Sequence, residues 1–270
     1  MTSTQIVIKY FGLLLAILLI ISIFSGIYYG VATISSAFTK DKEILTELKE
    51  MKINKEAKLL ELDVKAATIN ITSGSTLKIE TNNDSIKVTE DNYKIIVKDN
   101  SKNRFKVNPK TEINITIPTD YIFEGINIET GAGKLFIDSL KTEVLSLDLG
   151  AGKVEINNLV VSKKGSIDTG AGEFIIKNGS LNDIEFNLGT GKTDIKSLFT
   201  GSSTIDAGIG ELNLNLLSDI NMYELKIDKG LGSISLNEES IKSGTYGNGI
   251  NKIDISSGIG SINITTNNNR

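Results

Sequence analysis

Hydrophobic and polar residues alternate along the second half of the chain in short runs separated by glycine, asparagine and aspartate. Leu147 and Leu149 alternate with polar residues before a pair of glycines, and Val154 and Ile156 do so after it. A period of two is typical of a β-strand with one buried face. The pattern therefore predicts an all-β region with a strand on each side of the glycine pair.

This strand, glycine, strand pattern recurs. Five copies read IETGAGKLFIDSL, LDLGAGKVEINNL, IDTGAGEFIIKNG, FNLGTGKTDIKSL and IDAGIGELNLNLL, and two looser copies read IDKGLGSISLNEE and ISSGIGSINITTN. Their first glycines lie 19, 20, 19, 19, 22 and 28 residues apart. So short and regular a period predicts a β-solenoid, in which strands stack on their equivalents above and below over residues 126–265.

The paired glycines are expected at the turns of this solenoid, where positive φ angles or close packing between turns exclude side chains. The predicted turn glycines are Gly131, Gly133, Gly150, Gly152, Gly170, Gly172, Gly189, Gly191, Gly208, Gly210, Gly230, Gly232, Gly258 and Gly260.

One copy contains GTGKT, which is similar to the end of a phosphate-binding loop. That loop needs a glycine five residues before the GK pair and a helix after it. Phe186 occupies the glycine position, and the following TDIKSLFTG alternates like a strand. We therefore interpret GTGKT as a structural turn and expect no bound nucleotide.

The N-terminal part carries a membrane signal. Residues 10–31 contain no charge and are long enough to cross the ~30 Å hydrocarbon core of a bilayer as a helix. Aromatic residues lie near both ends, as is common at membrane interfaces. The alternative is a signal peptide cleaved after Ala37, but the apolar run exceeds the usual 7 to 15 residues. We favour an uncleaved single-pass anchor that binds the lipid bilayer.

The orientation of this anchor is ambiguous from charge alone. Lys9 precedes it within the flank 1–9, whereas Lys40, Lys42 and several further lysines follow it. The positive-inside rule would then place the C-terminal part in the cytoplasm, although long domains cross membranes despite their charge.

The regions outside the repeats are expected to support them. Leu48 and Met51 belong to an apolar stripe at helical spacing, which predicts an amphipathic helical stalk or linker. The polar residues after Ile264 could cover the open edge of the last turn. The expected organisation outside anchor and repeats is a stalk at 32–61, an irregular β lead-in and cap at 62–125 and a polar tail at 266–270.

Composition narrows the possible functions. The net charge of −4 and pI near 5.2 offer no basic field for nucleic acid. The chain has neither cysteine nor histidine, which excludes disulfides and thiolate chemistry and removes the commonest general base and transition-metal ligand. A polysaccharide-acting β-helix enzyme would also need carboxylates and a basic group that depart from the repeat. We expect a non-enzymatic protein without a cofactor.

Two features are candidates for binding. Acidic residues two positions before the first glycines would form a column, in which neighbouring carboxylates repel unless lysines after the glycines or calcium relieve them. We favour solvated or lysine-paired acids over calcium. The second candidate is the longer segment 236–252, whose aromatic residue is Tyr246. The candidate calcium column comprises Glu129, Asp148, Asp168, Asp206 and Asp228.

The I-D-x-G-x-G repeats, the lead-in that ends in NITIPTDY and the single N-terminal apolar segment resemble the bacterial "putative adhesin" family, a domain of unknown function. The resemblance covers residues 62–265. It implies a membrane-anchored β-solenoid outside the cytoplasm, which we prefer over the lysine count. It also implies display or binding of an envelope protein or polymer. The alternative is an accessory role in envelope-stress signalling through the membrane helix and stalk.

Overall fold

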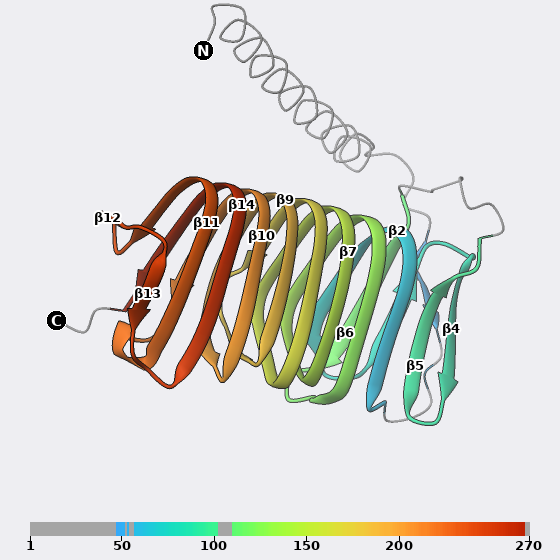
Figure 1. The fold of residues 1–270 in the computed structure, drawn as a ribbon. Coiled ribbons are helices and arrows are strands. Elements are labelled where there is room, and N and C mark those ends of the chain that lie inside the picture. The colour runs from blue at the N-terminus through green and yellow to red at the C-terminus, as the bar shows by residue number, and fades with distance from the viewer. Residues whose placement is uncertain (1–46, 52, 54–56, 102–109, 268–270) are drawn as a thin grey trace, which may run out of the picture.

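The computed structural model describes residues 47–51, 53, 57–101 and 110–267. These residues form one sheet of 14 strands and the short 3-10 helix η1 (Ile220–Met222) (Figure 1). The strands are β1 (Lys49–Met51), β2 (Leu59–Gly74), β3 (Lys78–Thr81), β4 (Ile86–Asp91), β5 (Lys94–Asp99), β6 (Glu112–Pro118), β7 (Phe123–Ile176), β8 (Gly179–Asn182), β9 (Ile184–Thr200), β10 (Ser202–Leu216), β11 (Tyr223–Leu236), β12 (Glu239–Ser240), β13 (Gly244–Gly247) and β14 (Asn251–Thr266).

The predicted all-β fold is confirmed, and the sheet winds into a solenoid of parallel turns. We call each turn a rung, the glycine pair its corner, and the strand segments before and after that corner its first and second limbs. Phe186 pairs in parallel register with Ile167 on one side and with Ile205 on the other. Each rung therefore forms backbone hydrogen bonds to the rungs on both sides, which is how a 19-residue unit too small for its own core becomes stable.

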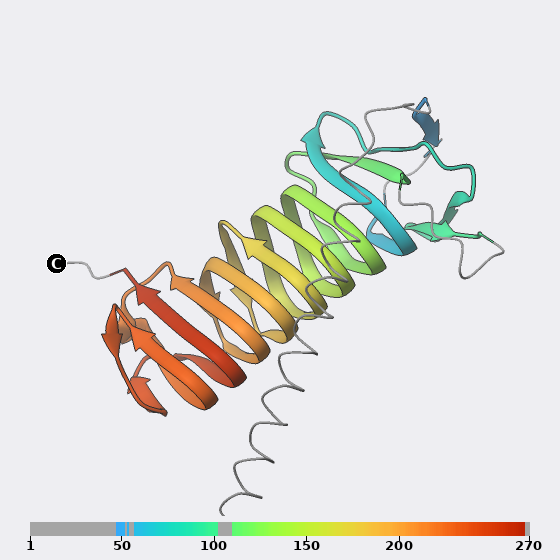
Figure 2. The same cartoon turned by 90° about the horizontal axis from the view of Figure 1, so that it is seen from above.

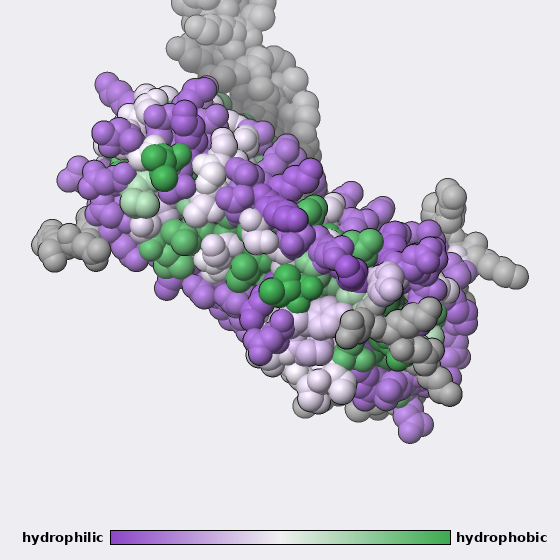
Figure 3. Space-filling view, turned by 90° about the horizontal axis from the view of Figure 1, so that it is seen from below, coloured by the Kyte–Doolittle hydropathy of each residue, from purple (hydrophilic) through white to green (hydrophobic). Residues whose placement is uncertain are grey.

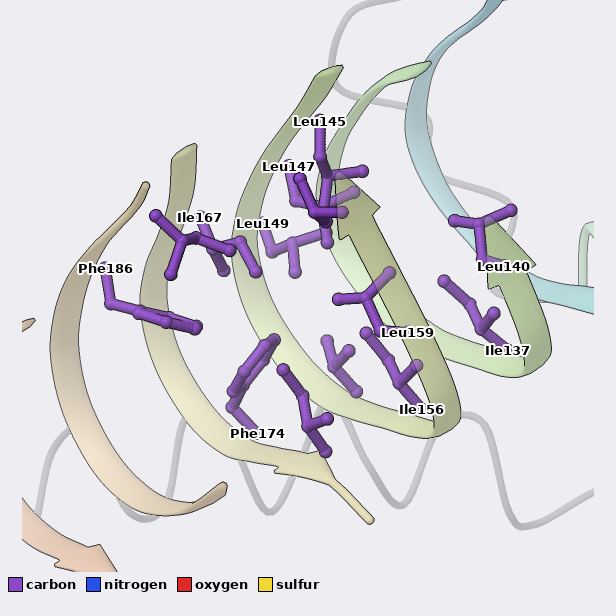
Figure 4. Close-up of a cluster of buried hydrophobic side chains, with 14 of the residues drawn as sticks. Ile137, Leu140, Leu145, Leu147, Leu149, Ile156, Leu159, Ile167, Phe174 and Phe186 are labelled. Carbon is purple, nitrogen blue, oxygen red and sulfur yellow. The ribbon is translucent and has the colours of Figure 1, made fainter. Parts of the chain in front are cut away.

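The core lies between the two limbs. Leu145, Leu147 and Leu149 project inward from a first limb and meet Ile156 and Leu159 from its second limb (Figure 4). Leu147 and Ile156 are completely buried. Phe186 lies between two other aromatic rings, with centroid distances of 6.2 Å to Phe174 and 6.3 Å to Phe199. The alternation seen in the sequence thus gives a continuous apolar interior.

The first rung has no glycine pair. Strand β2 runs parallel to the start of β7, and Ala66 and Ala67 take the positions of Ala132 and Gly133. Both alanines are buried. The outer edge of β2 is covered by β5 along its first limb and by β6 along its second limb. This end, which we call the proximal end, also carries the antiparallel pairs of β3 with β6 and β4 with β5.

The order of the rungs differs from the order of the sequence at the other, distal end. Strand β14 lies between β10 and β11 and pairs in parallel with both (Figures 1 and 2). The expectation that the residues after Ile264 cover the last rung is therefore wrong for 265–267, the part of that segment that the structure describes. The last rung is β11, because the 28-residue step between the final two glycine pairs lets the chain return and insert a rung.

The edge of β11 that faces away from β14 is covered by the segment that follows β11 in the chain. Strand β13 pairs antiparallel with Glu224–Ile227 on the first limb, and β12 pairs with Ser235 and Leu236 on the second limb. At the corner, Lys229 donates a side-chain hydrogen bond to the carbonyl of Gly232. A covered and charged edge discourages pairing with another chain.

The described part of the predicted helical stalk is a strand. Lys49–Met51 forms β1 and pairs antiparallel with β3, so the helix predicted there is wrong for these residues. Exposed ion pairs accompany the pairing, at 2.8 Å between Lys49 and Asp84 and 3.4 Å between Lys78 and Glu50. No helix among the described residues is long and apolar enough to span a bilayer. The predicted anchor, residues 10–31, lies outside them.

Candidate functional site

The glycine pairs of successive rungs stack into a continuous row along the solenoid. The second glycine of every pair from Gly133 to Gly260 has a φ between +137° and +146°. At Gly210 a Cβ atom would lie 1.8 Å from the carbonyl oxygen of Gly191, and at Gly150 it would lie 2.1 Å from that of Gly131. The glycines therefore supply both a positive φ and room for the neighbouring rung.

The GTGKT segment is one of these corners. It lies inside β9, which continues as a strand to Thr200, so the helix of a phosphate-binding loop does not follow it. Lys192 forms an ion pair with Asp194 at 3.1 Å. Its side chain is therefore held on the second limb, and the segment has the geometry of a solenoid turn.

The predicted column of acids lies on the outer face of the first limbs, beside an open groove along the corner. From Asp168 to the distal end, its members alternate with neutral residues. Asn187 lies between Asp168 and Asp206 in the ladder, and donates a 2.7 Å hydrogen bond to Asp168. Ser256 lies between Asp206 and Asp228, and its hydroxyl donates to Asp206. Amide and hydroxyl donors thus relieve part of the expected repulsion.

The lysines after the corners do not cross to this column. Lys153 pairs with Glu173 of the next rung at 3.0 Å and with Glu155 at 3.6 Å, both on second limbs. In the part of the chain that the structure describes, no three acidic side chains converge closely enough to hold a metal ion. Glu129, Asp148 and Asp168 follow one another within β7, but nothing in this geometry singles them out as calcium ligands.

The carboxyl groups with a resolved pKa shift are shifted downward. Hydrogen bonds from Ser73 and then Asn157 hold the pKa of Asp138 below its usual value. The Lys177 ammonium, which hydrogen-bonds to Glu155, does the same for the pKa of that carboxyl. A catalytic general acid near neutral pH needs the opposite shift. These groups are suited to ion pairing and hydrogen bonding.

Tyr246 lies in β13, opposite Leu225 of β11. The ring is half-buried and packs against the core, while the hydroxyl donates a 2.7 Å hydrogen bond to the carbonyl of Lys242. The segment proposed from the sequence as a binding loop therefore covers the distal edge. A ligand at Tyr246 stays a prediction.

Another surface is apolar. Seen from below, apolar residues form a broken band along the stack with hydrophilic residues on both sides (Figure 3). The most exposed large apolar side chains include Ile122 at 62% and Ile250 at 84%, which precede the first limbs of β7 and β14.

The outer face of the second limbs at the distal end could not be predicted as a surface from the sequence. That face carries uncharged amide and hydroxyl side chains on β10, β14 and β11. The alternating N-x-N and N-x-T motifs from Asn213 and Asn263 are the visible signal. The two motifs form one surface only because β14 lies between β10 and β11, and the sequence does not show this order of strands.

These features define a class of protein, a parallel β-solenoid whose rungs bend at paired glycines. The chain belongs to the Toastrack DUF4097 family, whose model matches residues 57–243. The resemblance predicted from the repeats is confirmed. The matched range includes the distal rung β11 and ends before β14, the strand that inserts beside it.

Solved structures with similar folds come from several bacteria. A putative cell adhesion protein from Clostridium sporogenes is 16% identical, with 82% of this chain and 100% of that chain covered and a TM-score of 0.34. A putative adhesin from Bacteroides fragilis is 16% identical, with coverages of 83% and 98% and a TM-score of 0.43. A putative lipid binding protein from Parabacteroides distasonis is 13% identical, with coverages of 81% and 96% and a TM-score of 0.35. Comparison with curated proteins gave no match.

Proposed function

We propose that this protein is a non-enzymatic binding module, anchored in the bacterial cell membrane through residues 10–31, that displays its solenoid outside the cytoplasm. The observation that carries the proposal is the winding itself. Backbone ladders join every rung to its neighbours from β2 to β11, so that outward side chains form straight columns on a rigid support. Such columns suit an extended envelope protein or polymer better than a small substrate.

The chemistry of the described surface supports binding over catalysis. Several carboxylates form ion pairs with lysines of neighbouring rungs, as in the pairs Lys153–Glu173 and Lys163–Glu143 at 3.0 and 2.7 Å. The groove along the first limbs repeats similar residues from rung to rung. Catalysis requires a focused set of groups with distinct protonation states, whereas repeated binding to a polymer requires equivalent positions.

Protease accessibility tests the proposed location. The full-length chain with a C-terminal epitope is produced in bacterial cells, the wall is removed, and protease is added while a cytoplasmic marker reports leakage. We expect loss of the epitope with the marker intact. Protection until lysis would contradict display outside the cytoplasm and support the orientation favoured by the lysines after the anchor.

The anchor is tested in the same cells. We expect the full-length chain to remain in the membrane fraction after high-salt washing and to keep its N-terminus. Replacing Leu19 and Ile23 by lysine should release it or prevent its export, because charges near the centre of a membrane helix are costly. A mature chain that begins after Ala37 would contradict the anchor and favour the signal peptide.

A further inference from the structure

The outer face of the second limbs changes its chemistry along the solenoid. On the second limbs of β7 and β9 it carries charges such as Lys153, Glu173 and Lys192. Beyond Glu211 of β10, which lies beside Ser261 in the ladder, the outer positions of this face on β10, β14 and β11 are uncharged. We call this region the amide-hydroxyl array, which comprises Asn213, Asn215, Ser261, Asn263, Thr265, Ser233, Ser235 and Asn237.

The array is continuous in three dimensions although its residues are not in sequence. Asn213 pairs with Asn263 and Asn215 with Thr265 across the ladder between β10 and β14. Ser235 then pairs with Asn263 from the other side. Residues at alternate positions share a face, and adjacent strands lie ~4.8 Å apart. The result is a regular lattice of amides and hydroxyls.

This neutrality is specific to one face. The first limbs of the same three strands carry charges on their outer side, among them Asp206 on β10, Asp254 on β14 and Lys226 on β11. A general loss of charge in the distal rungs would have affected both limbs. The loss of charge is therefore confined to the second limbs.

Part of the hydrogen-bonding capacity of the array is used within it, and part is used at its charged border, where Asn213 donates to Asp194 at 2.6 Å and to Glu211 at 3.0 Å. Asn263 donates to Asn213 at 2.9 Å and accepts from Ser235 at 3.0 Å. An amide has two N–H groups and two oxygen lone pairs, so Asn263 retains one of each. Asn215 and Ser233 form no side-chain hydrogen bond with the described residues. The ladder thus fixes the orientation of some amides and leaves other groups available.

A shallow groove crosses this face along the solenoid axis. It is lined by residues of four successive rungs, including Lys177 of β7, Lys196 of β9, Asn215 of β10 and Thr265 of β14. The groove therefore enters the array from its charged border. Its direction suits an extended ligand that crosses several rungs.

We propose that the amide-hydroxyl array binds an extended, predominantly neutral glycan. Amides and hydroxyls both donate and accept, as sugar hydroxyls do, and an uncharged lattice avoids the cost of desolvating ions. The array contains no aromatic platform, so each sugar gains only hydrogen bonds of modest net value. Affinity must then rise with chain length as further rungs are engaged. This inference deepens the proposed binding function and rests on it.

Binding of the full-length protein in detergent to an array of neutral and acidic bacterial polysaccharides, each with fragments of graded length, tests the proposal. We expect binding to a neutral glycan that strengthens with length. Asn215→Asp and Thr265→Asp, tested singly, should each weaken it about tenfold, because a carboxylate in this array cannot donate and must be desolvated.

The matched control is Thr245→Asp, which adds the same charge to an exposed position of β13, opposite Lys226 on the first limb of β11. It should leave binding unchanged, and all variants should keep the wild-type melting temperature. Absence of binding to every glycan, preference for acidic glycans, or equal loss in Thr245→Asp would each overturn the proposal. If no glycan binds but protease removes the C-terminal epitope from intact cells, only the glycan proposal is refuted. If the epitope is protected until lysis, the proposed function itself is refuted.

Discussion

The second glycine of each corner combines two demands that a side chain cannot meet together. At Gly172 the φ is +141°, and a Cβ atom would lie 1.8 Å from the carbonyl oxygen of Gly152. The obstacle is backbone, which cannot turn away without breaking the ladder on both sides. Conformation and packing therefore both require glycine at this residue.

Gly172→Ala should lower the free energy of unfolding by at least about 2 kcal/mol, since the strained backbone and the contact with Gly152 add up. Chemical denaturation of the full chain measures this. Gly244→Ala is the control, because its Cβ would meet only Tyr246 at ordinary distances of 3.8 Å or more. If Gly172→Ala and Gly244→Ala have the same free energy of unfolding, glycine is not required at the corner.

Acid should weaken the solenoid partly through Asp138. Hydrogen bonds from Ser73 and Asn157 lower its pKa in the folded state. The ionised carboxylate therefore adds to the free energy of unfolding above the unfolded-state pKa of about 4, and this stabilisation is lost as pH falls through the folded-state pKa. Asp138→Asn should melt slightly lower at pH 7 and lose less stability between pH 5 and 3. Melting curves across that range test this against Asp120→Asn, whose partly paired side chain is 98% exposed. An unchanged acid dependence in Asp138→Asn would contradict it.

The rungs could be predicted from the sequence only where glycines marked them. The rung of β2 was missed because Lys65 and Ala67 stand at its corner in place of the glycine pair. Side chains are tolerated there because the strands that cover the outer edge of β2 pair with its two limbs and not with this corner. Similarly, the apolar spacing around Met51 favoured a local helix, but pairing of β1 with β3 is a non-local interaction that helical periodicity does not report.

Among the elements, the order of strands could not be predicted because equivalent rungs have equivalent edges. Ile255 is as suitable a neighbour for Ile205 as Ile227 is, and the structure places it between them. The long connection between β11 and β14 allows the inserted order. The same connection supplies β12 and β13, which cover the edge of β11.

Replacing residues 237–248 by a glycine–serine linker of equal length should expose the edge of β11 and cause association that rises with protein concentration. Light scattering of the full-length protein in detergent measures this. A second variant keeps Gly244–Gly247 within the linker, and should associate less because β13 pairs again with the first limb. Identical particle sizes for wild type and both variants would show that the hairpin does not protect this edge.

On the scale of the whole molecule, the solenoid presents different surfaces from the same repeat. The first limbs carry a column of acids that alternates with amide and hydroxyl groups from Asp168 onward. The second limbs change from paired charges to the neutral array. The acid column could be predicted because its members recur at one position of the repeat. The array could not, because its continuity depends on the inserted strand β14.

The central claim is that this surface faces outward from the cell. Because the chain has no cysteine, single cysteines provide labels with no background. Asn248→Cys lies on an exposed connection at the distal end, and Ser3→Cys lies before the predicted anchor. With a membrane-impermeant maleimide on intact cells, the account predicts labelling of Asn248→Cys at once and of Ser3→Cys only after lysis. The reverse pattern would contradict it.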